Sequence, residues 1–409
     1  MRLRFISLNL RKSKFMRPKK TRGNPPLQTP PRVAVLVDTS TDWSRRVIAG
    51  ISNYVKKHDV WQLFIEPHGI EEHLELQRGW QGDGVIARIS NEGLARSLHA
   101  RNIPVVNISG IKLSGPKFPL VTSDVVISAR LAAEYFLDRG FRNFAYLNLV
   151  GLEYVSRQRE AFVAAVKQAG CNCELHGVKT HSGAQAVDWN VRIDSLGQWL
   201  LTLPKPTAVF TWSGGREVIH ACQQAGLRVP EDIALLSGTD DQLCEISHVP
   251  ISAVRAACER IGYEAAAMLD KLMHQATVKD RVKLFPPLGV VSRQSTDTLA
   301  ITNPAMAKAV RFILKNAGKP IRVSQVAAAA GIHRRLLERR FHEVMRRTPA
   351  EHIRRVHIDC AKKLLIETDL AIADVAEGAG FGSAEYLSTL FQKELGTTPL
   401  RYRRESQRS

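Results

Sequence analysis

The sequence predicts an α/β body of two lobes, followed by an all-α domain in which one helix-turn-helix pattern occurs twice. Short β-branched runs alternate with amphipathic segments between residues 33 and 274. This alternation is typical of parallel sheets with helices on both faces. About 265 residues is long for one such sheet, so we expect two Rossmann-like lobes with a cleft between them. The duplicated pattern lies in the last hundred residues.

The elements of the body follow one another as strand, loop and helix. Residues 33–37 read Val-Ala-Val-Leu-Val and suit a buried parallel strand. An amphipathic helix is expected after them, at residues 44–57. Further strands are expected at 84–87, 105–108, 144–147, 208–210 and 233–236, and further helices at 94–100, 124–139, 157–169, 216–225 and 258–274. Residues 290–297 are expected to form a closing strand and an exit linker, so the body spans 32–298 and the helical domain 303–404.

Charge is unevenly distributed along the 409 residues, whose formal net charge is +19. Residues 1–32 hold ten Lys/Arg and no acid, residues 33–300 hold 28 of each sign, and residues 301–409 hold 20 Lys/Arg against 11 acids. A neutral body with a basic C-terminal end is what a polyanion-binding module on a ligand-sensing body would show. The leader, residues 1–31, is expected to be disordered, with a DNA-contacting arm as the alternative.

Several classes of protein are disfavoured by what the sequence lacks. The six cysteines show no metal-ligand spacing and fit reduced thiols in a cytoplasmic protein. No apolar run approaches the roughly 20 residues that span a bilayer, and the leader lacks a signal-peptide pattern. We therefore expect no membrane partner and no extracytoplasmic solute-binding protein. Without a nucleophile motif or a P-loop, no catalytic residue, metal or cofactor is expected, and a sugar-acting enzyme remains the remote alternative.

The duplicated pattern is a pair of helices joined by a glycine turn. One copy begins at Val326-Ala327, and the other begins 49 residues later, at Val375-Ala376. Gly331 and Gly380 would supply the left-handed turn residue. A Leu and a Phe four residues apart lie on the buried face of each second helix, as the pairs Leu337/Phe341 and Leu387/Phe391. Two copies with matching anchors favour DNA reading over a helical bundle that oligomerises.

The exposed face of each second helix supplies the candidate DNA contacts. These are His333, Arg334, Arg335, Glu338, Arg339 and Arg340 in the first copy, and Ser383, Glu385, Tyr386 and Ser388 in the second. Arginine can bridge two acceptors of guanine, and further arginines can neutralise phosphates. The first helix is rich in arginine, so we expect it to carry more of the affinity. The nearly neutral second helix is expected to add shape or apolar contacts. A long connecting helix, residues 349–367, would hold the two at the separation of adjacent major-groove turns, roughly 34 Å.

The C-terminal domain resembles the AraC family of transcription regulators over residues 303–402. The residues that carry the resemblance are 337–341, 348–353, 361–365, 380–382, 396–399 and 402–403. Members usually carry an all-β sensor, which the strand and helix alternation argues against here. The whole chain is instead similar to the xylose-operon regulators of that family, at residues 34–40, 82–88, 139–141, 229–232 and 260–266.

This resemblance implies a sugar-responsive, DNA-binding regulator with a periplasmic-binding-protein-like sensor. Its implied partners are double-stranded operator DNA, xylose or a related monosaccharide, a second copy of the chain and, for an activator, RNA polymerase. Ligands of open α/β sheets sit at the carboxyl ends of strands. A sugar site needs charged groups for hydroxyls and an aromatic plane for the ring. The candidates at such positions are Asp38, Ser40, Trp43, Arg45, Asp124, Arg157, Arg159 and Asp240.

Three positions depart from the resemblance. Sensors of the LacI type carry Asn-Asp where this chain has Trp212-Ser213, so a carboxylate that could hold hydroxyls is missing. An Arg-x-x-Gly-Phe motif is out of register at residues 157–162, and the loop at residues 240–243 is short. A sensor that binds a non-sugar effector, or none, therefore stays open as the alternative.

Overall fold

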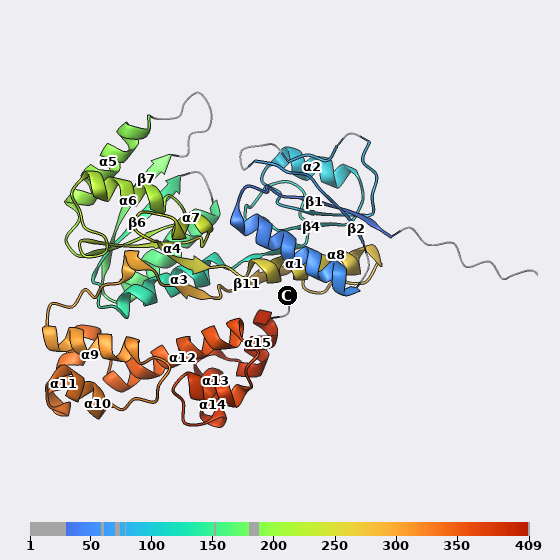
Figure 1. Cartoon of the computed structure of the whole chain (residues 1–409). Coiled ribbons are helices and arrows are strands. Elements are labelled where there is room, and N and C mark those ends of the chain that lie inside the picture. Colours follow the sequence, from blue (N-terminus) through green and yellow to red (C-terminus); the bar gives the residue numbers. More distant parts are fainter. Residues whose placement is uncertain are drawn as a thin grey trace, which may run out of the picture. The chain divides into compact units, whose positions relative to one another are not determined.

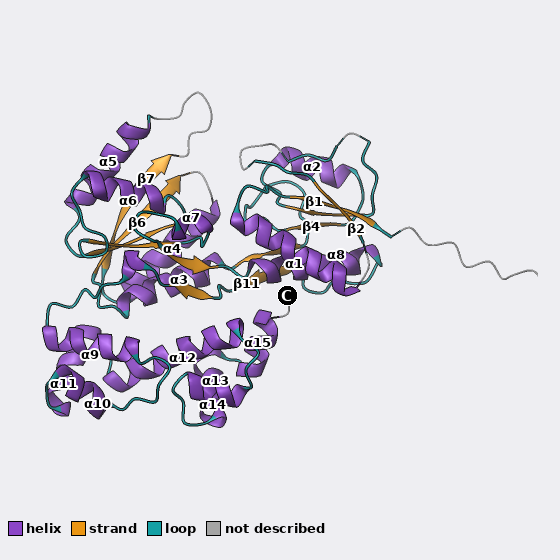
Figure 2. Cartoon of the chain, viewed as in Figure 1, coloured by secondary structure: helices purple, strands orange, loops and turns teal. Residues whose placement is uncertain are grey.

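The computed structural model describes residues 30–58, 61–69, 74–77, 79–150, 153–179 and 188–407. These residues form two six-stranded sheets, each with helices against it, and a C-terminal helical domain (Figures 1 and 2). The predicted fold class is therefore confirmed. Of the leader that was expected to be disordered, residues 1–29 lie outside the described part of the chain.

The first lobe is built on a sheet of parallel strands. In spatial order the strands are β11 (Val282–Phe285), β5 (Leu120–Ser123), β4 (Val105–Asn107), β3 (Gly84–Ala87), β1 (Arg32–Leu36) and β2 (Gln62–Ile65). Val33 and Val35 belong to the core that includes α1 (Asp42–His58) and α8 (Cys258–Met273), whereas Ala34 belongs to the core that includes α2 (Glu92–Ala100). Both faces of β1 are thus buried, which explains its unbroken apolar sequence.

Helices α1 and α8 cross closely because each has a glycine at the contact. A Cβ atom on Gly50 would lie 1.8 Å from the carbonyl oxygen of Glu259, and one on Gly262 would lie 2.0 Å from that of Val47. Any larger side chain at either position would force the helices apart. The N-terminal and C-terminal parts of the α/β body are therefore joined inside the first lobe.

The second lobe repeats this arrangement with one antiparallel edge strand. Its strands, in spatial order, are β12 (Gly289–Val291), β10 (Ser252–Arg255), β9 (Ile233–Ser237), β8 (Thr207–Thr211), β6 (Asn143–Val150) and β7 (Asn172–Lys179). Strand β12 runs antiparallel to β10. One core includes α3 (Val125–Leu137) and α4 (Glu153–Gln168), and the other includes α5 (Trp189–Thr202) and α6 (Gly215–Gln224). A short helix, α7 (Gln242–Glu245), follows β9.

The chain passes between the two lobes three times, from β5 to α3, from β10 to α8 and from β11 to β12. The segment after β12 was expected to be an exit linker, and this part of the prediction is wrong. Ser295 is fully buried. Its hydroxyl donates to the carbonyl of Leu235 at 2.6 Å and accepts from the backbone N–H of Ser252 at 2.8 Å. A segment rich in Ser and Thr looks like a linker in the sequence. Its burial could not be predicted, because its hydrogen-bond partners lie on strands that are distant in the chain.

The C-terminal helical domain consists of seven helices in the described residues. They are α9 (Pro304–Lys315), α10 (Val323–Ala330), α11 (Arg334–Met345), α12 (Pro349–Glu367), α13 (Ile372–Gly378), α14 (Ala384–Leu395) and α15 (Pro399–Gln407). Two separate cores each contain one helix-turn-helix, and α12 contributes to both. The four predicted anchors, Leu337, Phe341, Leu387 and Phe391, are fully buried. In the described residues, no helix is both long and apolar enough to cross a membrane.

Candidate DNA-binding surface and effector-binding residues

Helices α11 and α14, which we call the reading helices, each begin just after a left-handed glycine. The φ angle is +69° at Gly331 and +76° at Gly380, as the duplicated pattern predicts. The side chain of Ser383 caps α14 by accepting from the backbone N–H of Tyr386 at 3.2 Å. His333, at the matching position before α11, makes no such cap. Its ring is exposed and therefore accessible to a ligand.

The predicted contacts on α11 are mostly exposed, and they differ in their pairing. His333, Arg334, Arg335, Glu338 and Arg339 are exposed, whereas Arg340 is half-buried. The Nε atom of Arg334 lies 2.9 Å from a carboxylate oxygen of Glu338, one turn further along. Arg335 forms no ion pair with any residue that the structure describes. Its guanidinium is therefore accessible to an outside anion.

The contacts predicted on α14 carry little charge. Glu385 and Tyr386 are exposed, and 49% of the surface of Tyr386 is accessible. The hydroxyl of Ser388 donates to the carbonyl of Ala384 at 2.8 Å, so it is turned back on its own helix. Tyr386 is therefore the largest exposed group on the second reading helix.

Helix α12 connects the two helix-turn-helix units, and strong helix-start signals mark its first residues. Thr348 and Glu351 form a reciprocal capping box, with hydrogen bonds of 3.2 and 2.8 Å, and Pro349 occupies the first helical position. Its 19 residues correspond to a rigid rod of about 28 Å. This length is close to one turn of the DNA duplex, roughly 34 Å.

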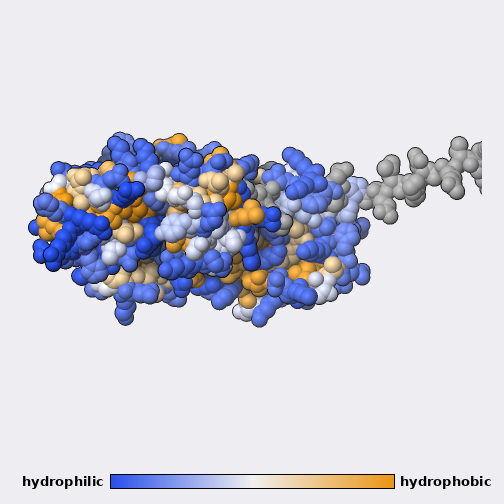
Figure 3. Space-filling view, turned by 90° about the horizontal axis from the view of Figure 1, so that it is seen from below, coloured by the Kyte–Doolittle hydropathy of each residue, from blue (hydrophilic) through white to orange (hydrophobic). Residues whose placement is uncertain are grey.

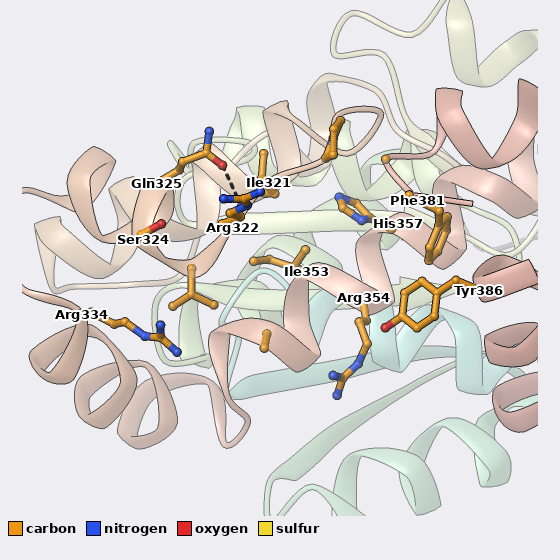
Figure 4. Close-up of a pocket in the computed structure, with 15 residues that line it drawn as sticks. Ile321, Arg322, Ser324, Gln325, Arg334, Ile353, Arg354, His357, Phe381 and Tyr386 are labelled. Atoms are coloured by element: carbon orange, nitrogen blue, oxygen red, sulfur yellow. Dashed lines mark hydrogen bonds between the residues drawn. The ribbon is translucent and has the colours of Figure 1, made fainter. Parts of the chain in front are cut away.

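An open pocket of about 840 Å³ lies between the two helix-turn-helix units (Figure 4). It is lined from α11 by Arg334, from α12 by Ile353, Arg354 and His357, and from α14 by Tyr386. Residues 320–325 and 380–382 complete its wall. Since Arg334 and Tyr386 lie on the reading helices, the pocket belongs to the same surface as the predicted contacts.

Two arginines of this surface, Arg322 and Arg354, are absent from the sequence-based prediction. Both are exposed and line the pocket. Helix α12 was expected to act only as a spacer, so its polar positions were not considered. The sequence did contain a sign of this surface, because Arg354 and Arg355 stand between the apolar residues Ile353 and Val356 of the connecting helix. In the space-filling view from below, strongly hydrophilic side chains gather at one end of the molecule, and apolar side chains lie among them (Figure 3).

In the α/β body, Asp38 is the most strongly held of the predicted effector contacts. It follows β1 and is only 2% exposed. Its carboxylate accepts from the hydroxyl of Thr41 at 2.7 Å and from that of Ser44 at 3.0 Å. Arg88, which follows β3, lies 3.4 Å away. Both oxygens of this buried carboxylate therefore already have partners within the protein, and a ligand would have to displace one of them.

Side chains of the second lobe approach this site. Burial raises the pKa of Tyr154 on α4, and the Arg88 guanidinium acts against that rise. Tyr154 packs edge-on against Trp212, with ring centroids 5.0 Å apart. Lys112, in the loop after β4, lies 3.2 Å from Glu153. The strand ends of the two lobes therefore meet around Asp38, Arg88, Tyr154 and Trp212.

The other predicted effector contacts have partners within the protein. Asp124 caps α3 and accepts two backbone N–H bonds of 3.0 Å. Both carboxylate oxygens of Asp240 are occupied, by Arg255 at 2.9 Å and by Arg293 at 2.8 Å. Arg45 donates to main-chain carbonyls, and Trp43 packs against the first core. Ser40 is exposed and lies 3.5 Å from Asp38. Arg157 lies near Glu153, and Arg159 lies near Glu160.

The sequence-based prediction did not include Gln158, a further buried polar side chain in the second lobe. Gln158 on α4 is fully buried, and its Oε1 atom accepts from the hydroxyl of Tyr146 at 2.8 Å. Its Nε2 atom has no acceptor among the described residues and lies 3.2 Å from where a Cβ of Gly238 would be. The predicted neighbours Arg157 and Arg159 flank it in sequence.

The described part of the chain contains no group of three or more His, Cys, Asp or Glu that could hold a metal.

A buried ion-pair cluster joins the second lobe to the helical domain. Asp138, which ends α3, accepts from Arg347 at 2.6 Å and from Arg355 on α12 at 2.8 Å. Arg355 also lies 2.5 Å from Glu134. Burial alone would raise the pKa of Asp138, but Arg355 and Arg347 hold it below its ordinary value. The carboxylate is therefore charged, and it ties the two parts of the chain together.

Three domain families match the chain in succession. The XylR N-terminal domain matches residues 32–126, a periplasmic binding protein-like domain matches residues 133–296, and a helix-turn-helix domain matches residues 326–405. The order of the three agrees with the two lobes and the helical domain seen in the structure.

Full-length relatives share this order. The chain is 28% identical to the xylose operon regulatory protein of Escherichia coli K12, over 91% of this chain and 96% of the relative. The chain is thus similar to the xylose operon regulatory proteins over most of its length. The corresponding protein of Haemophilus influenzae is also 28% identical, over 91% of this chain and 98% of its own. A solved structure, of a xylose-binding transcription activator, matches with 27% identity and a TM-score of 0.60, covering 93% of this chain and 99% of that one.

These comparisons confirm the expectation of a DNA-binding transcription regulator. The chain unites a periplasmic-binding-protein-like body with an AraC-type helix-turn-helix domain. The relatives that match over nearly their whole length are named as regulators, so the remote alternative of a sugar-acting enzyme gains no support.

Proposed function

We propose that this protein reads a two-part operator by placing α11 and α14 in two successive turns of the major groove. The observation that carries the proposal is the pair of exposed reading helices at the two ends of α12. Arg335, which lacks an ion-pair partner among the described residues, is the first candidate for a base or phosphate contact. We assign DNA binding to residues 303–404 and sensing to residues 32–298.

A gel shift on the region upstream of its own gene tests the first reading helix. Arg334→Ala and Arg335→Ala should each weaken binding by about 5- to 160-fold, because a good bidentate base contact contributes roughly 1–3 kcal/mol. Arg311→Ala, which removes an exposed arginine of α9, is the matched control and should change binding little. Unchanged binding by both α11 variants would rule out this helix as the base reader.

We further propose that the effector is a monosaccharide, with D-xylose the first candidate. The relatives' names refer to xylose. Asp38 would accept hydrogen bonds from sugar hydroxyls in place of those from Thr41 and Ser44, and Arg88 would donate hydrogen bonds to hydroxyl oxygens. Charged groups make the strongest such bonds. Trp212 and Tyr154 would face the apolar side of the ring. The other predicted contacts, Asp124 and Asp240 among them, would serve by shaping the strand ends.

Calorimetric titration of the full chain with D-xylose tests this assignment. We expect saturable binding that Asp38→Asn weakens at least tenfold, because the buried carboxylate would lose its charge. Asp280→Asn, which alters an exposed loop, should bind as the parent protein does. The same titration with D-glucose and L-arabinose ranks the sugar classes.

A second candidate is a sensor that binds a non-sugar effector or none. The pairing of Asp240 with two arginines favours it, because a sugar hydroxyl would have to displace a charged partner from this carboxylate. If no sugar gives a heat of binding or a shift in melting temperature, this candidate replaces the sugar assignment.

We propose that the Asp138 cluster carries the effector's signal to the helical domain. Helix α3 begins directly after β5 of the first lobe and ends at Asp138, so a change in lobe closure would move its far end. We also propose that the protein contacts RNA polymerase, because a relative is named a transcription activator. We further propose that it acts in the cytoplasm as a homodimer. Light scattering of the full chain tests the dimer.

A further inference from the structure

The surface between the two reading helices carries two exposed arginines that form no salt bridge within the described residues. We call it the bridge surface, formed by Arg322, Ile353, Arg354 and His357. Arg354 lies on α12, and Arg322 directly precedes α10. Both side chains are exposed. In Figure 4, Arg334 and Arg354 lie on either side of the opening, with Ile353 between them.

The neighbouring arginine shows that the exposure of Arg354 is not general for this helix. Arg355 is turned to the opposite side, where it pairs with Asp138 and Glu134. Glu351, one turn before Arg354, is engaged at the start of the helix, where it accepts from the backbone N–H of Thr348 at 2.8 Å. Hydrogen bonds from Thr348 are the main cause of the lowered pKa of Glu351, and the charge of Arg354 adds to it. Arg354 nonetheless forms no salt bridge within the described residues, and its exposed side chain is accessible to an outside anion.

The floor of the bridge surface is rigid and apolar. Ile353 is 6% exposed and belongs to the core of the first helix-turn-helix unit. Phe381, also 6% exposed, belongs to the core of the second. Arg322 is fixed at its backbone, whose N–H donates to Gln325 at 2.8 Å. Arg354 is therefore presented from a fixed base, at a fixed distance from both reading helices.

The geometry of DNA determines what this surface faces. Two reading helices in successive major-groove turns lie on one side of the duplex. Midway between those turns, the same side presents the minor groove. A narrow minor groove in A/T-rich DNA has an enhanced negative potential that attracts arginine. Arginine is also more weakly hydrated than lysine and enters such a groove more readily.

We propose that Arg354, assisted by Arg322, reads the minor groove of the spacer between the two half-sites and favours an A/T-rich spacer. The proposal rests on the two-turn reading mode proposed above and adds a specificity at base pairs that neither reading helix reaches. Loss of the Arg354 contact should leave recognition of the half-sites intact. Failure of the two proposals can therefore be told apart.

The test uses the full chain and three duplexes with identical half-sites, selected in vitro from random DNA. Their central five base pairs are A·T, G·C or inosine·C. Inosine lacks the 2-amino group of guanine, so it keeps the major-groove edge of G·C but presents the minor groove of A·T. In fluorescence anisotropy, the protein should bind the A·T and inosine·C spacers alike, about 3- to 10-fold more tightly than the G·C spacer.

Variants then assign this preference to the residue. Arg354→Ala should bind all three spacers within about twofold of one another, and Arg354→Lys should retain affinity but lose most of the preference. Arg311→Ala should behave as the parent protein does. Binding of inosine·C like G·C, or an Arg354→Ala variant that loses affinity equally for all spacers, would overturn the proposal. The three-duplex comparison with the parent protein decides the matter even if a variant does not fold. If instead Arg334→Ala and Arg335→Ala both leave binding unchanged, the two-turn mode itself fails.

Discussion

At the scale of single residues, the joint between the α/β body and the helical domain depends on buried polar groups. His352 is fully buried beside Asp138, and its ring packs edge-on against Phe341 with centroids 5.5 Å apart. Neither ring nitrogen has a hydrogen-bond partner among the described residues. Burial lowers the pKa of His352 to about 4, with Asp138 opposing this and Arg347, Arg355 and Arg139 reinforcing it.

A histidine held neutral in this way makes the protein sensitive to mild acid. The unfolded chain takes up a proton near pH 6.5, the folded protein only near pH 4. The contribution of neutral His352 to the free energy of unfolding is therefore complete above pH 6.5. It falls as the pH drops from 6.5 to 4, by about 3 kcal/mol in total. Below about pH 4, protonation of Asp138 should remove further stability, because its pKa is lowered in the fold.

Urea denaturation between pH 4 and pH 7 measures this dependence. His352→Leu should flatten the curve between pH 6.5 and 4, whereas His99→Gln, at an exposed site on α2, should leave it unchanged. A variant curve as steep as that of the parent protein would mean that other groups cause the acid sensitivity.

At the scale of elements, the two helix-turn-helix units have the same design but different tolerances. Both turns require a left-handed residue, and glycine supplies it. A Cβ atom on Gly331 would meet nothing within 4 Å, whereas one on Gly380 would lie 2.6 Å from the carbonyl oxygen of Lys319. The second turn is packed against the segment before α10, and the first is open.

The two Gly→Ala variants should therefore differ in cost. Gly331→Ala should lower the free energy of unfolding by about 1–2 kcal/mol, the cost of a left-handed alanine. Gly380→Ala should cost about 1–3 kcal/mol more, because backbone must move to admit the methyl group. Chemical denaturation of both variants gives the comparison, and equal costs would contradict the packing described for the second turn.

The helical domain was the more predictable half because its signals are local. Gly331, Leu337 and Phe341 lie within one short segment, and the same spacing recurs at Gly380. Strand β11 could not be predicted, because residues 282–285 pair with β5, far earlier in the chain. The polar edge strand β7 lacks the apolar run that marks the central strands. At the candidate effector site, Asp38 was found from its place after β1, but Arg88, Tyr154 and Gln158 were not, because folding alone brings them together.

At the scale of the whole molecule, the cluster around Asp138 is where effector binding and DNA binding can be separated. We expect Asp138→Asn to bind both operator DNA and D-xylose within about threefold of the parent protein. It should lose the effect of one ligand on the other, because that coupling is a free energy distinct from either affinity. Anisotropy titrations of DNA with and without sugar measure it. An unaltered response would place the coupling elsewhere, and Asp280→Asn controls for the loss of one charge.

The central claim is that one chain binds both a sugar and DNA and that each binding event alters the other. The most direct measurement is the affinity of the full chain for its own upstream DNA, at a fixed salt concentration, with and without saturating D-xylose. We expect the affinity for DNA to change about fivefold or more, and we expect Asp38→Asn to abolish this change. DNA binding that D-xylose and other monosaccharides leave unchanged would contradict it.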